Sequence, residues 1–511
     1  MATTADLNLS EKGLAPSLDI SKPPSQRQYF NAPEKNNSSR GGGWRALTSR
    51  ALKSGRLETN GLEPIPESQR TNTNFLDVGT LWFCMNANIL PITFGMLGTS
   101  VYGLSLRDSS LVILFFTLLT TIVVAFLSTL GPKTGMRQMI QARYSFGRYL
   151  VCVPVLLNLA TLTGFCIIMT VIGGQCLSAV SRGSLSPSVG IVIVALLAMV
   201  ISVFGFHTLH IFERYAWIPT IIAIAIATGA GADKLGNQTV PAGSGASAPQ
   251  ILSFGMIAAS YMLPWGCLSS DFSAYMAPSA SSWRIFTYSY VGLALPTILL
   301  MILGAAIGGA VTNVPEWEAL YHETLVGGAL AGMLLPLHGF GRFVVAILSF
   351  SLLGNVAATS YAITLNFQQL AVPLSRVPRY VFAVLLTAII IPIAIPAAKD
   401  FLVSLENFIA LIGYWSAAFL AVVTVEHLLF RRGDCAQYDP AIWDDAAQLP
   451  LGAAALSACV LSFALVIPSM AQVWWVGPIA EKTGDIGFEI AFVLTGLLYV
   501  PLRALEKKYY R

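Results

Sequence analysis

The feature that most constrains this chain is a series of long apolar runs, of which residues 111–130 are the clearest because they contain no charge. About 20 apolar residues in a helix match the thickness of the hydrocarbon core of a bilayer. Such runs recur along most of the chain, in which 55% of residues are hydrophobic and 11% are charged. Soluble domains contain about 25% charged residues. The sequence therefore predicts an all-α polytopic membrane protein.

Twelve transmembrane helices are expected from these runs. They are predicted at about 78–103, 111–130, 151–180, 188–207, 214–231, 251–276, 285–312, 341–371, 380–397, 402–429, 450–469 and 486–503. Residues 325–341 are apolar but short and contain Pro336, which favours a surface or re-entrant helix. Residues 1–75 are rich in Ser, Asn, Pro and Gly and have no long apolar run, which predicts a disordered cytosolic tail.

The distribution of positive charge predicts the orientation, because loops rich in Lys and Arg stay in the cytosol. With the N-terminus inside, twenty-four Lys and Arg residues fall on the inner side and five on the outer side. Both ends of the chain are therefore expected in the cytosol. The outward loop after the fifth span contains Asn237-Gln-Thr, a short pattern that makes Asn237 a candidate for glycosylation.

The sixth span is expected to break near its middle, because Pro264 and Gly266 flank Trp265. The first span is interrupted in a comparable place by polar and helix-breaking residues between 86 and 95, which include Asn88 and Gly95. Interrupted helices at matching positions of two halves indicate an inverted-repeat transporter with its site between the repeats. The alternative is that Pro and Gly are simply common in membrane helices.

The third span carries Asn158, Leu162, Phe165, Met169 and Ile172 at spacings of four, three, four and three. These spacings place the five side chains on one helical face. Phe165 and Met169 could then lie against a planar heterocycle. Helix packing is the alternative interpretation of the same stripe.

The eighth span has a polar face made of Asn355, Thr359, Asn366 and Gln369. Polar groups inside a membrane face a cavity or a neighbouring helix. Asn amides offer donors and acceptors, as a heterocycle with ring nitrogens requires. Asn355 and Thr359 are the candidates for a binding site, while hydrogen bonding between helices is an equal alternative for Asn366 and Gln369.

Asp271 is the main candidate for coupling transport to an ion, because it is an intramembrane carboxylate that shares the broken sixth span with Trp265. It could equally be a structural cap or the ion-pair partner of an Arg near the cytosol. The seven cysteines form no C-x-x-C pair, and the histidines show no metal-ligand spacing. No cofactor, metal site or nucleic-acid partner is expected.

Several local motifs resemble those of the nucleobase and cation symporter family, in its fungal purine-cytosine permease branch. They are Gly131-Pro-Lys-Thr-Gly-Met-Arg-Gln-Met, Arg143-Tyr-Ser-Phe-Gly, Gly173-Gly-Gln, Ser270-Asp-Phe and Gly354-Asn. The resemblance implies a LeuT-type fold of two inverted five-helix repeats plus two C-terminal helices, and proton-coupled uptake at the plasma membrane. It divides the chain into the tail 1–75, a ten-helix transport core 76–430, and a part 431–511 with a cytosolic loop, the last two helices and a short cytosolic C-terminus.

The resemblance also assigns roles to individual residues. Trp265 matches the aromatic residue that stacks on the substrate in the family. Phe165 and Met169 occupy positions where the branch usually has Trp and Asn, and the family's Pro-Asn step in the eighth span falls near Thr359 and Ser360. The candidate substrate-binding residues are therefore Trp265, Gly266, Phe165, Met169, Asn355, Thr359, Ser360 and Asn88.

These observations predict a secondary transporter that imports purines, cytosine or a related planar heterocycle by alternating access, driven by protons. Another ring compound, such as a B6-type vitamin, a nucleoside or a biosynthetic product, is the alternative cargo. Sodium could replace the proton if Ser351 and Thr359 helped to build a sodium site. A non-transporting sensor and a membrane-embedded enzyme are further alternatives, although the sequence shows no clustered catalytic groups and enzyme activity is not expected.

Overall fold

The computed structural model describes residues 62–181, 184–203, 206–239, 245–370, 372–375, 377 and 379–510. The predicted tail lies outside these ranges up to residue 61. Helices account for almost all of the described secondary structure, which confirms the all-α class. Among the described residues the only strands are β1 (Ala471–Gln472) and β2 (Trp475–Val476), which form a small antiparallel hairpin.

The first half of the bundle contains η2 (Glu67–Gln69), α2 (Phe75–Asn86), α3 (Ile89–Ser100), α4 (Leu106–Ser128), α5 (Leu130–Thr134), α6 (Gln138–Gln141), α7 (Arg143–Phe146), α8 (Cys152–Val180), α9 (Pro187–Val203) and α10 (Phe206–Leu235). The second half contains α11 (Ala248–Met262), η3 (Leu263–Cys267), α12 (Ser269–Ser273), α13 (Ser282–Val311), α14 (Pro315–Thr324), α15 (Val326–Met333), η4 (Leu335–Leu337), α16 (His338–Phe350), α17 (Leu353–Leu370), α18 (Val372–Ser375), α19 (Arg379–Ala397), α20 (Phe401–Val425) and η5 (Glu426–Phe430). The C-terminal part contains η6 (Cys435–Gln437), η7 (Pro440–Ile442), α21 (Ala453–Ser469), α22 (Ala480–Thr483) and α23 (Gly487–Tyr509).

Every predicted span coincides with a helix or with a broken helix. Within the described ranges, eight helices are long and apolar enough to cross a membrane, and the bent pair α2 and α3 makes nine. The other three predicted spans correspond to the shorter apolar helices α9 and α21 and to the interrupted series α11, η3 and α12. The region predicted as a surface or re-entrant helix contains α15 and η4.

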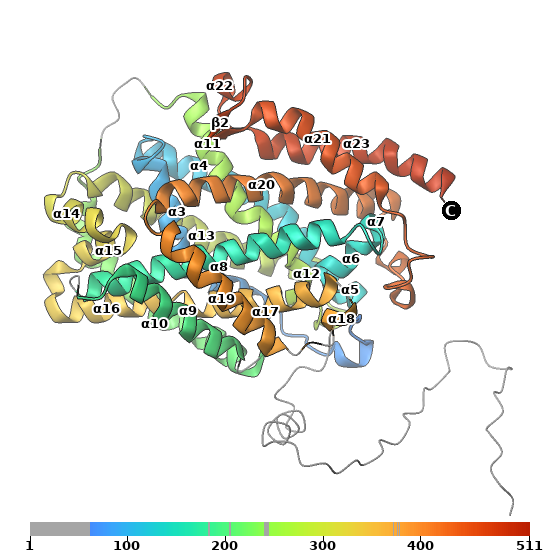
Figure 1. The fold of residues 1–511 in the computed structure, drawn as a ribbon, viewed down its shortest axis with the longest axis horizontal. Helices are drawn as coiled ribbons and strands as arrows, with labels where there is room; N and C mark the ends of the chain where they lie inside the picture. The colour runs from blue at the N-terminus through green and yellow to red at the C-terminus, as the bar shows by residue number, and fades with distance from the viewer. Residues whose placement is uncertain are drawn as a thin grey trace, which may run out of the picture. The chain divides into compact units, whose positions relative to one another are not determined.

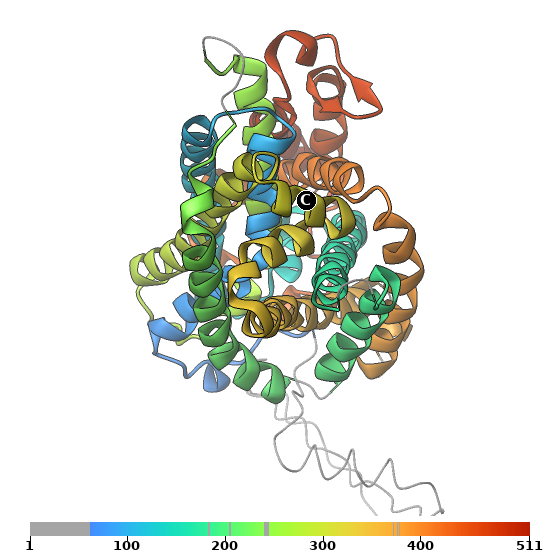
Figure 2. The ribbon, with the colours of Figure 1, turned by 90° about the vertical axis from the view of Figure 1, so that its left-hand side faces the viewer.

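The short helices mark the two ends of the bundle. In Figure 1, α14 and α15 lie at one end, and α5, α6 and α7 lie near the other. Figure 2 looks onto the end that carries α14 and α15. The end with α5, α6 and α7 is the one that the charge distribution predicts to face the cytosol, and we call it the inner end.

The predicted break in the first span is confirmed. α2 ends at Asn86, α3 begins at Ile89, and the two helices are bent by 53°. The side chain of Asn88 caps α3 by accepting a hydrogen bond from the backbone N–H of Leu90 at 2.9 Å. Gly95 does not interrupt the helix, contrary to the expectation from sequence. A Cβ atom there would lie 1.9 Å from the carbonyl oxygen of Met301, so glycine allows α3 to pack closely on α13.

The predicted break in the sixth span is also confirmed. α11 ends at Met262 and continues as the 3₁₀ segment η3, which contains Pro264, Trp265 and Gly266. The proline lacks a backbone donor, which favours this tighter geometry over a regular α-helix. A Cβ atom at Gly266 would lie 2.5 Å from a methyl group of Leu420, so the glycine lets η3 approach α20.

Packed structure begins earlier than the predicted end of the tail at residue 75. The guanidinium of Arg70 donates to the carbonyl of Pro132 at 2.7 Å, and the backbone N–H of Ile65 donates to Gly135 at 2.8 Å. Asn72 accepts from the backbone N–H of Ala277 at 2.8 Å, which connects this segment to the chain after α12. Hydrogen bonds between segments so far apart in the sequence leave no compositional signal.

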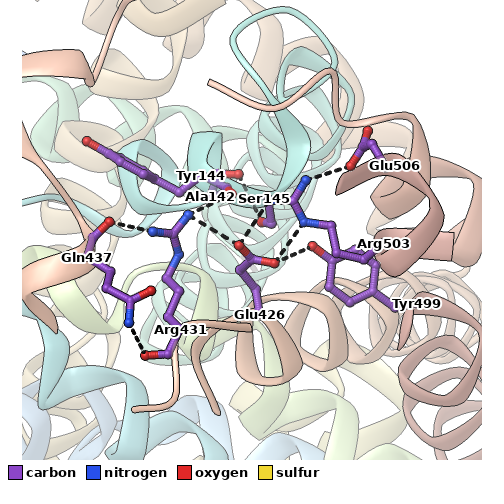
Figure 3. A network of polar contacts seen from close by, with 9 residues as sticks. All are labelled: Ala142, Tyr144, Ser145, Glu426, Arg431, Gln437, Tyr499, Arg503 and Glu506. Atoms are coloured by element: carbon purple, nitrogen blue, oxygen red, sulfur yellow. Dashed lines mark hydrogen bonds and ion pairs between the residues drawn. The ribbon is translucent and has the colours of Figure 1, made fainter. Parts of the chain in front are cut away.

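A buried ionic network joins the C-terminal helices to α20 at the inner end (Figure 3). Glu426 is 2% exposed and accepts hydrogen bonds from Arg503 at 3.1 and 3.2 Å and from the Tyr499 hydroxyl at 2.8 Å. Arg431 lies on its other side at 3.2 Å, and Arg503 also pairs with Glu506 at 2.7 Å. The two acids and two bases balance in charge, as burial of such groups requires.

At the opposite end, Asp485 connects three spans. Its carboxylate accepts hydrogen bonds from the Tyr414 hydroxyl of α20 and from the backbone N–H groups of Ala471 and Gly487, the latter two at 2.9 Å. Its own backbone N–H donates to the Ser253 hydroxyl of α11 at 3.0 Å. Burial raises the pKa of Asp485 above its ordinary value, and the hydrogen bonds to its carboxylate oppose that rise.

Candidate functional site

The break in the first span is held by two amide side chains that share one acceptor. The carbonyl of Met85 accepts from the Asn88 side chain at 2.9 Å and from the Asn355 side chain of α17 at 2.8 Å. The Asn355 oxygen in turn accepts from the Thr359 hydroxyl at 3.1 Å. Because Asn88, Asn355 and Thr359 are all at most 4% exposed, these bonds are shielded from competition with solvent.

A second contact joins the two broken helices directly. The Tyr261 hydroxyl of α11 donates to the Asn86 side chain at 3.0 Å, and Asn86 donates to the carbonyl of Trp82 at 3.1 Å. The ring of Trp82 meets the ring of Trp265 edge to face, with centroids 5.8 Å apart. It meets Phe272 in the same way at 5.1 Å. The structure therefore brings the two interruptions together, as the comparison of the two spans predicts.

Phe165 lies close to the sixth and tenth spans. Its ring is 6.5 Å from Tyr261 and 5.5 Å from Phe408, with perpendicular planes in both cases. Met169, one turn further along α8, is 1% exposed. The indole N–H of Trp415 donates to the Thr161 hydroxyl at 2.9 Å, which joins α20 to the same side of α8.

Tyr261, Trp82 and Trp415 are among the contact residues that carry no role in the sequence prediction. Tyr261 precedes Trp265 by four residues and so shares its helical face, which is a signal that the sequence contains. Nothing local distinguishes Trp82 or Trp415 from the other tryptophans of the apolar spans.

Ser360 lies on a different face of α17 from Asn355. It follows Asn355 by five residues, which turns its side chain through about 140° around the helix. Its hydroxyl donates to the carbonyl of Val356 at 2.7 Å, and the same carbonyl accepts from the Cys166 thiol of α8 at 3.9 Å. Ser360 therefore lies on the face of α17 that packs against α8.

Asp271 connects α12 to the short helix α6 at the inner end. Its carboxylate accepts from the backbone N–H of Gln138 at 2.7 Å, which caps the start of α6. Two neighbouring hydroxyls fix α12 on α4, because Ser270 donates to the carbonyl of Leu127 at 3.0 Å and Ser273 donates to that of Ser128 at 2.6 Å. From the sequence, Asp271 has three candidate roles, namely a coupling group, a structural cap or an ion-pair partner. The structure shows the cap, at the start of α6.

A small cleft lies beside the Met85 carbonyl. Its walls come from the break in the first span, from α10 and from the junction of α16 and α17 within the eighth span. They are formed by Cys84, Met85, Ala87, Ala216, Trp217, Thr220, Ser351, Gly354 and Asn355. The Ser351 hydroxyl donates to the carbonyl of Leu348 at 2.6 Å, which leaves its oxygen lone pairs available to a donor or a cation.

The described parts of the chain contain no group of three or more His, Cys, Asp or Glu residues that could hold a metal ion. Asn237 is exposed directly after α10, and its backbone carbonyl accepts from the Asn313 side chain at 3.0 Å. Its own side chain is therefore on the surface, where a glycosylation acceptor must be.

The fold and the site define the class. Two interrupted helices face each other across buried amides and aromatic rings in an all-α multi-span bundle, and this is the architecture of a secondary transporter.

The chain belongs to the permease family for cytosine/purines, uracil, thiamine and allantoin, because residues 64–488 match the model of that family. It is 34% identical to the purine-cytosine permease FCY2 of Saccharomyces cerevisiae, over 89% of this chain and 87% of that protein. It is 33% identical to the purine-cytosine permease fcyB of Emericella nidulans, over 89% and 90% of the two chains. The vitamin B6 transporter TPN1 of Saccharomyces cerevisiae is 27% identical over 88% of this chain and 87% of that protein.

Solved structures show the same fold. The closed conformation of Mhp1, a nucleobase-cation-symport-1 family transporter with bromovinylhydantoin bound, matches with a TM-score of 0.65 and 15% identity, over 89% of this chain and 96% of that one. The inward-facing conformation of Mhp1 gives the same TM-score with 16% identity, over 88% of this chain and 96% of that one. The predicted resemblance to fungal purine-cytosine permeases is thus confirmed, and the chain is a transporter, not an enzyme.

Proposed function

We propose that this chain imports a purine, cytosine or a closely related planar heterocycle across the plasma membrane, coupled to protons, with residues 76–430 as the transport core. The observation that carries the proposal is the junction of the two broken helices, where Asn355 reaches the Met85 carbonyl and Trp82 meets Trp265. The names of the relatives, which are purine-cytosine permeases, support the class of substrate.

The substrate would lie against the rings of Trp265 and Phe165, which supply flat apolar faces. A ring edge with a hydrogen-bond acceptor would take the N–H groups of Asn355, which now donate to the Met85 carbonyl at 2.8 Å. Substrate binding and the contact between the first and eighth spans would then compete for one amide. This competition links occupancy of the site to movement of the two spans.

Asp271 is our candidate for proton coupling. Ionised, its carboxylate makes a charge-assisted bond to the Gln138 N–H at 2.7 Å, and protonation would weaken that bond. The contact between α12 and α6 would then loosen at the inner end. Sodium is the alternative ion, with the cleft next to Ser351 as its place. Protons are favoured because the Met85 carbonyl in that cleft already accepts two N–H groups.

A B6-type vitamin is the second candidate cargo. Met169 provides a thioether at the position where the family resemblance places an Asn amide that would read the edge of a base, and loss of a matched polar contact weakens discrimination between bases. The likeness to a vitamin B6 transporter supports testing this alternative.

We also propose that both termini lie in the cytosol and that Asn237 is glycosylated. The exposed position of Asn237 supports the second proposal. Treatment of the expressed protein with a glycosidase should increase its electrophoretic mobility, and Asn237→Gln should abolish that shift.

The decisive experiment is uptake of labelled cytosine, adenine, hypoxanthine and pyridoxine by cells that lack their own transporters. Uptake should collapse with a protonophore and persist when choline replaces sodium. Trp265→Ala should reduce uptake at least about tenfold by removing the stacking face. The matched control is Trp283→Ala, because the Trp283 ring is 74% exposed. Unchanged uptake of every compound by Trp265→Ala protein at the cell surface would refute the proposed site.

Asp271→Asn tests the coupling separately. The variant should lose accumulation driven by the proton gradient and keep exchange of labelled for unlabelled substrate, which needs no net proton movement. Retained accumulation would rule out Asp271 as the coupling group and leave the substrate site unaffected.

A further inference from the structure

Asn158 of α8 has a fully buried side-chain amide, which takes no part in the contacts described around Trp265. Its exposed fraction is 0%, and neither its Oδ1 nor its Nδ2 has a hydrogen-bond partner in the described part of the chain. Buried polar groups almost always have partners, because leaving one without a partner costs the loss of its hydration. A buried amide whose oxygen and nitrogen both have no partner among the described residues requires a specific explanation.

Asn158 faces the same side as the candidate substrate site. It precedes Phe165 by seven residues, which is nearly two full turns, so the two side chains differ by only about 20° around the helix. The Phe165 ring contacts Tyr261 of α11 and Phe408 of α20, so this face of α8 points toward these two helices. Seven residues correspond to about 10 Å along the helix, toward the inner end.

The packing of α8 on α17 gives the depth of Asn158 relative to the eighth span. The Cys152 thiol contacts the Leu370 carbonyl at 3.8 Å, and the Cys166 thiol contacts the Val356 carbonyl at 3.9 Å. The two helices therefore run antiparallel with a constant register across 14 residues of each. In this register Asn158 lies at the level of residues 364–366 of α17.

Two more amides are available, Asn366 at about this depth and Gln369 about one helical turn nearer the inner end. Asn366 and Gln369 are 4% and 6% exposed, and Asn366 Nδ2 and Gln369 Oε1 have no partner among the described residues. Asn366 follows Asn355 by 11 residues, close to three full turns, so it lies on the face that carries the contact to Met85. Hydrogen bonding between helices is the alternative role that the sequence predicts for Asn366 and Gln369. Among the described residues, these two atoms make no such bond.

We propose that Asn158, Asn366 and Gln369 form a second binding station for the transported heterocycle, between Trp265 and the inner end. The station has free donors and free acceptors, so it fits a ring edge with a carbonyl next to an N–H, as in cytosine and the oxopurines. The substrate would move about two helical turns from the aromatic site to the amides before release. This inference rests on the proposed function, because it concerns the same cargo.

The test compares the two sides of the membrane with labelled cytosine as the probe. Right-side-out and inside-out vesicles are prepared from cells that express the wild type or Asn158→Leu. The variant should keep the wild-type KM within twofold in right-side-out vesicles and raise the KM at least tenfold in inside-out vesicles. Thr117→Val is the matched control, because its buried hydroxyl also has no partner in the described residues but lies on α4.

Thermal stability provides the readout that separates a binding role from a structural one. Leucine removes polar atoms that have no partner within the described ranges, so Asn158→Leu should unfold at the wild-type temperature or above. Lower stability, or failure of the variant to reach the membrane, would show a structural amide and overturn the station. An inner KM within twofold of wild type would overturn it as well, and Asn366→Leu repeats both measurements on the second helix.

The two proposals fail in different ways. If the wild type transports none of the tested heterocycles in right-side-out vesicles, the proposed function fails. If the wild type transports cytosine and Asn158→Leu behaves alike from both sides, only the second station fails.

Discussion

The shared acceptor at the break of the first span leads to a quantitative prediction. Two amides, from Asn88 and Asn355, donate to the same Met85 carbonyl at 2.9 and 2.8 Å. A carbonyl oxygen has two lone pairs, so one donor alone still satisfies it. Removing both donors leaves a buried carbonyl without a side-chain partner. The two substitutions should therefore cost more together than the sum of their separate effects.

The magnitudes follow from the contacts. Asn355→Leu loses its bond to Met85 and the bond from Thr359, which together amount to about 1–3 kcal/mol. Asn88→Ser keeps a hydroxyl oxygen that can cap α3 and loses the amide donor, at about 1 kcal/mol. The double variant adds the cost of an unsatisfied buried carbonyl, so the coupling between the sites should be about 1–3 kcal/mol.

The assay is a double-mutant cycle on the unfolding of purified protein in detergent, with uptake of labelled cytosine measured in parallel. A coupling of about 1.4 kcal/mol corresponds to a tenfold change in the ratio of folded to unfolded protein beyond additivity. Additive effects within about 0.5 kcal/mol would refute the shared-acceptor argument, because independent sites add within that range.

Three further substitutions test the supports of the site. Glu426→Gln should lower the free energy of unfolding by about 3–5 kcal/mol, because it breaks a buried ion pair with Arg503. The control is Glu316→Gln, which removes a solvent-exposed pair with Lys234 and should leave the unfolding transition where it is in the wild type. Burial raises the pKa of Asp485, so the folded state binds the carboxyl proton more tightly than the unfolded state does. The stability that this protonation contributes is therefore complete below the ordinary carboxyl pKa and is lost as the pH rises through the raised pKa. Asp485→Asn should flatten that part of the pH profile of thermal unfolding, and an unaltered profile would contradict the assignment. Gly95→Leu should prevent accumulation of folded transporter, since α3 cannot then approach Met301; normal expression and uptake would show that the helices can separate at little cost.

The sequence anticipated the site where the signal was local. Proline and glycine around Trp265 removed a backbone donor and a steric restraint, and a 3₁₀ segment stands there. Asn88 and Asn355 are polar in apolar spans, and both prove to be hydrogen-bonded at the same carbonyl. Ser360, which the family pattern groups with them, faces α8, the helix that carries Phe165 and Met169.

The contacts that depend on distant residues left no such signal. Tyr261 meets Asn86, and Trp82 meets Trp265, across about 180 residues of chain. A donor and its acceptor in different spans do not alter the apolar pattern of either span, so periodicity cannot pair them. The same reason explains why the packing of Arg70 on Pro132 was missed.

The sequence by itself determined that the chain crosses the membrane many times and that two of its helices break, because the bilayer limits span length and the absent proline donor limits helix continuity. Only the tertiary structure decided which polar groups meet. It joined Asn355 to the broken first span, assigned Asp271 to the cap of α6, and left Asn158 buried with an amide that has no hydrogen-bond partner among the described residues. The physical reason is that hydrogen bonds act over about 3 Å, so their partners are fixed by the relative placement of whole helices.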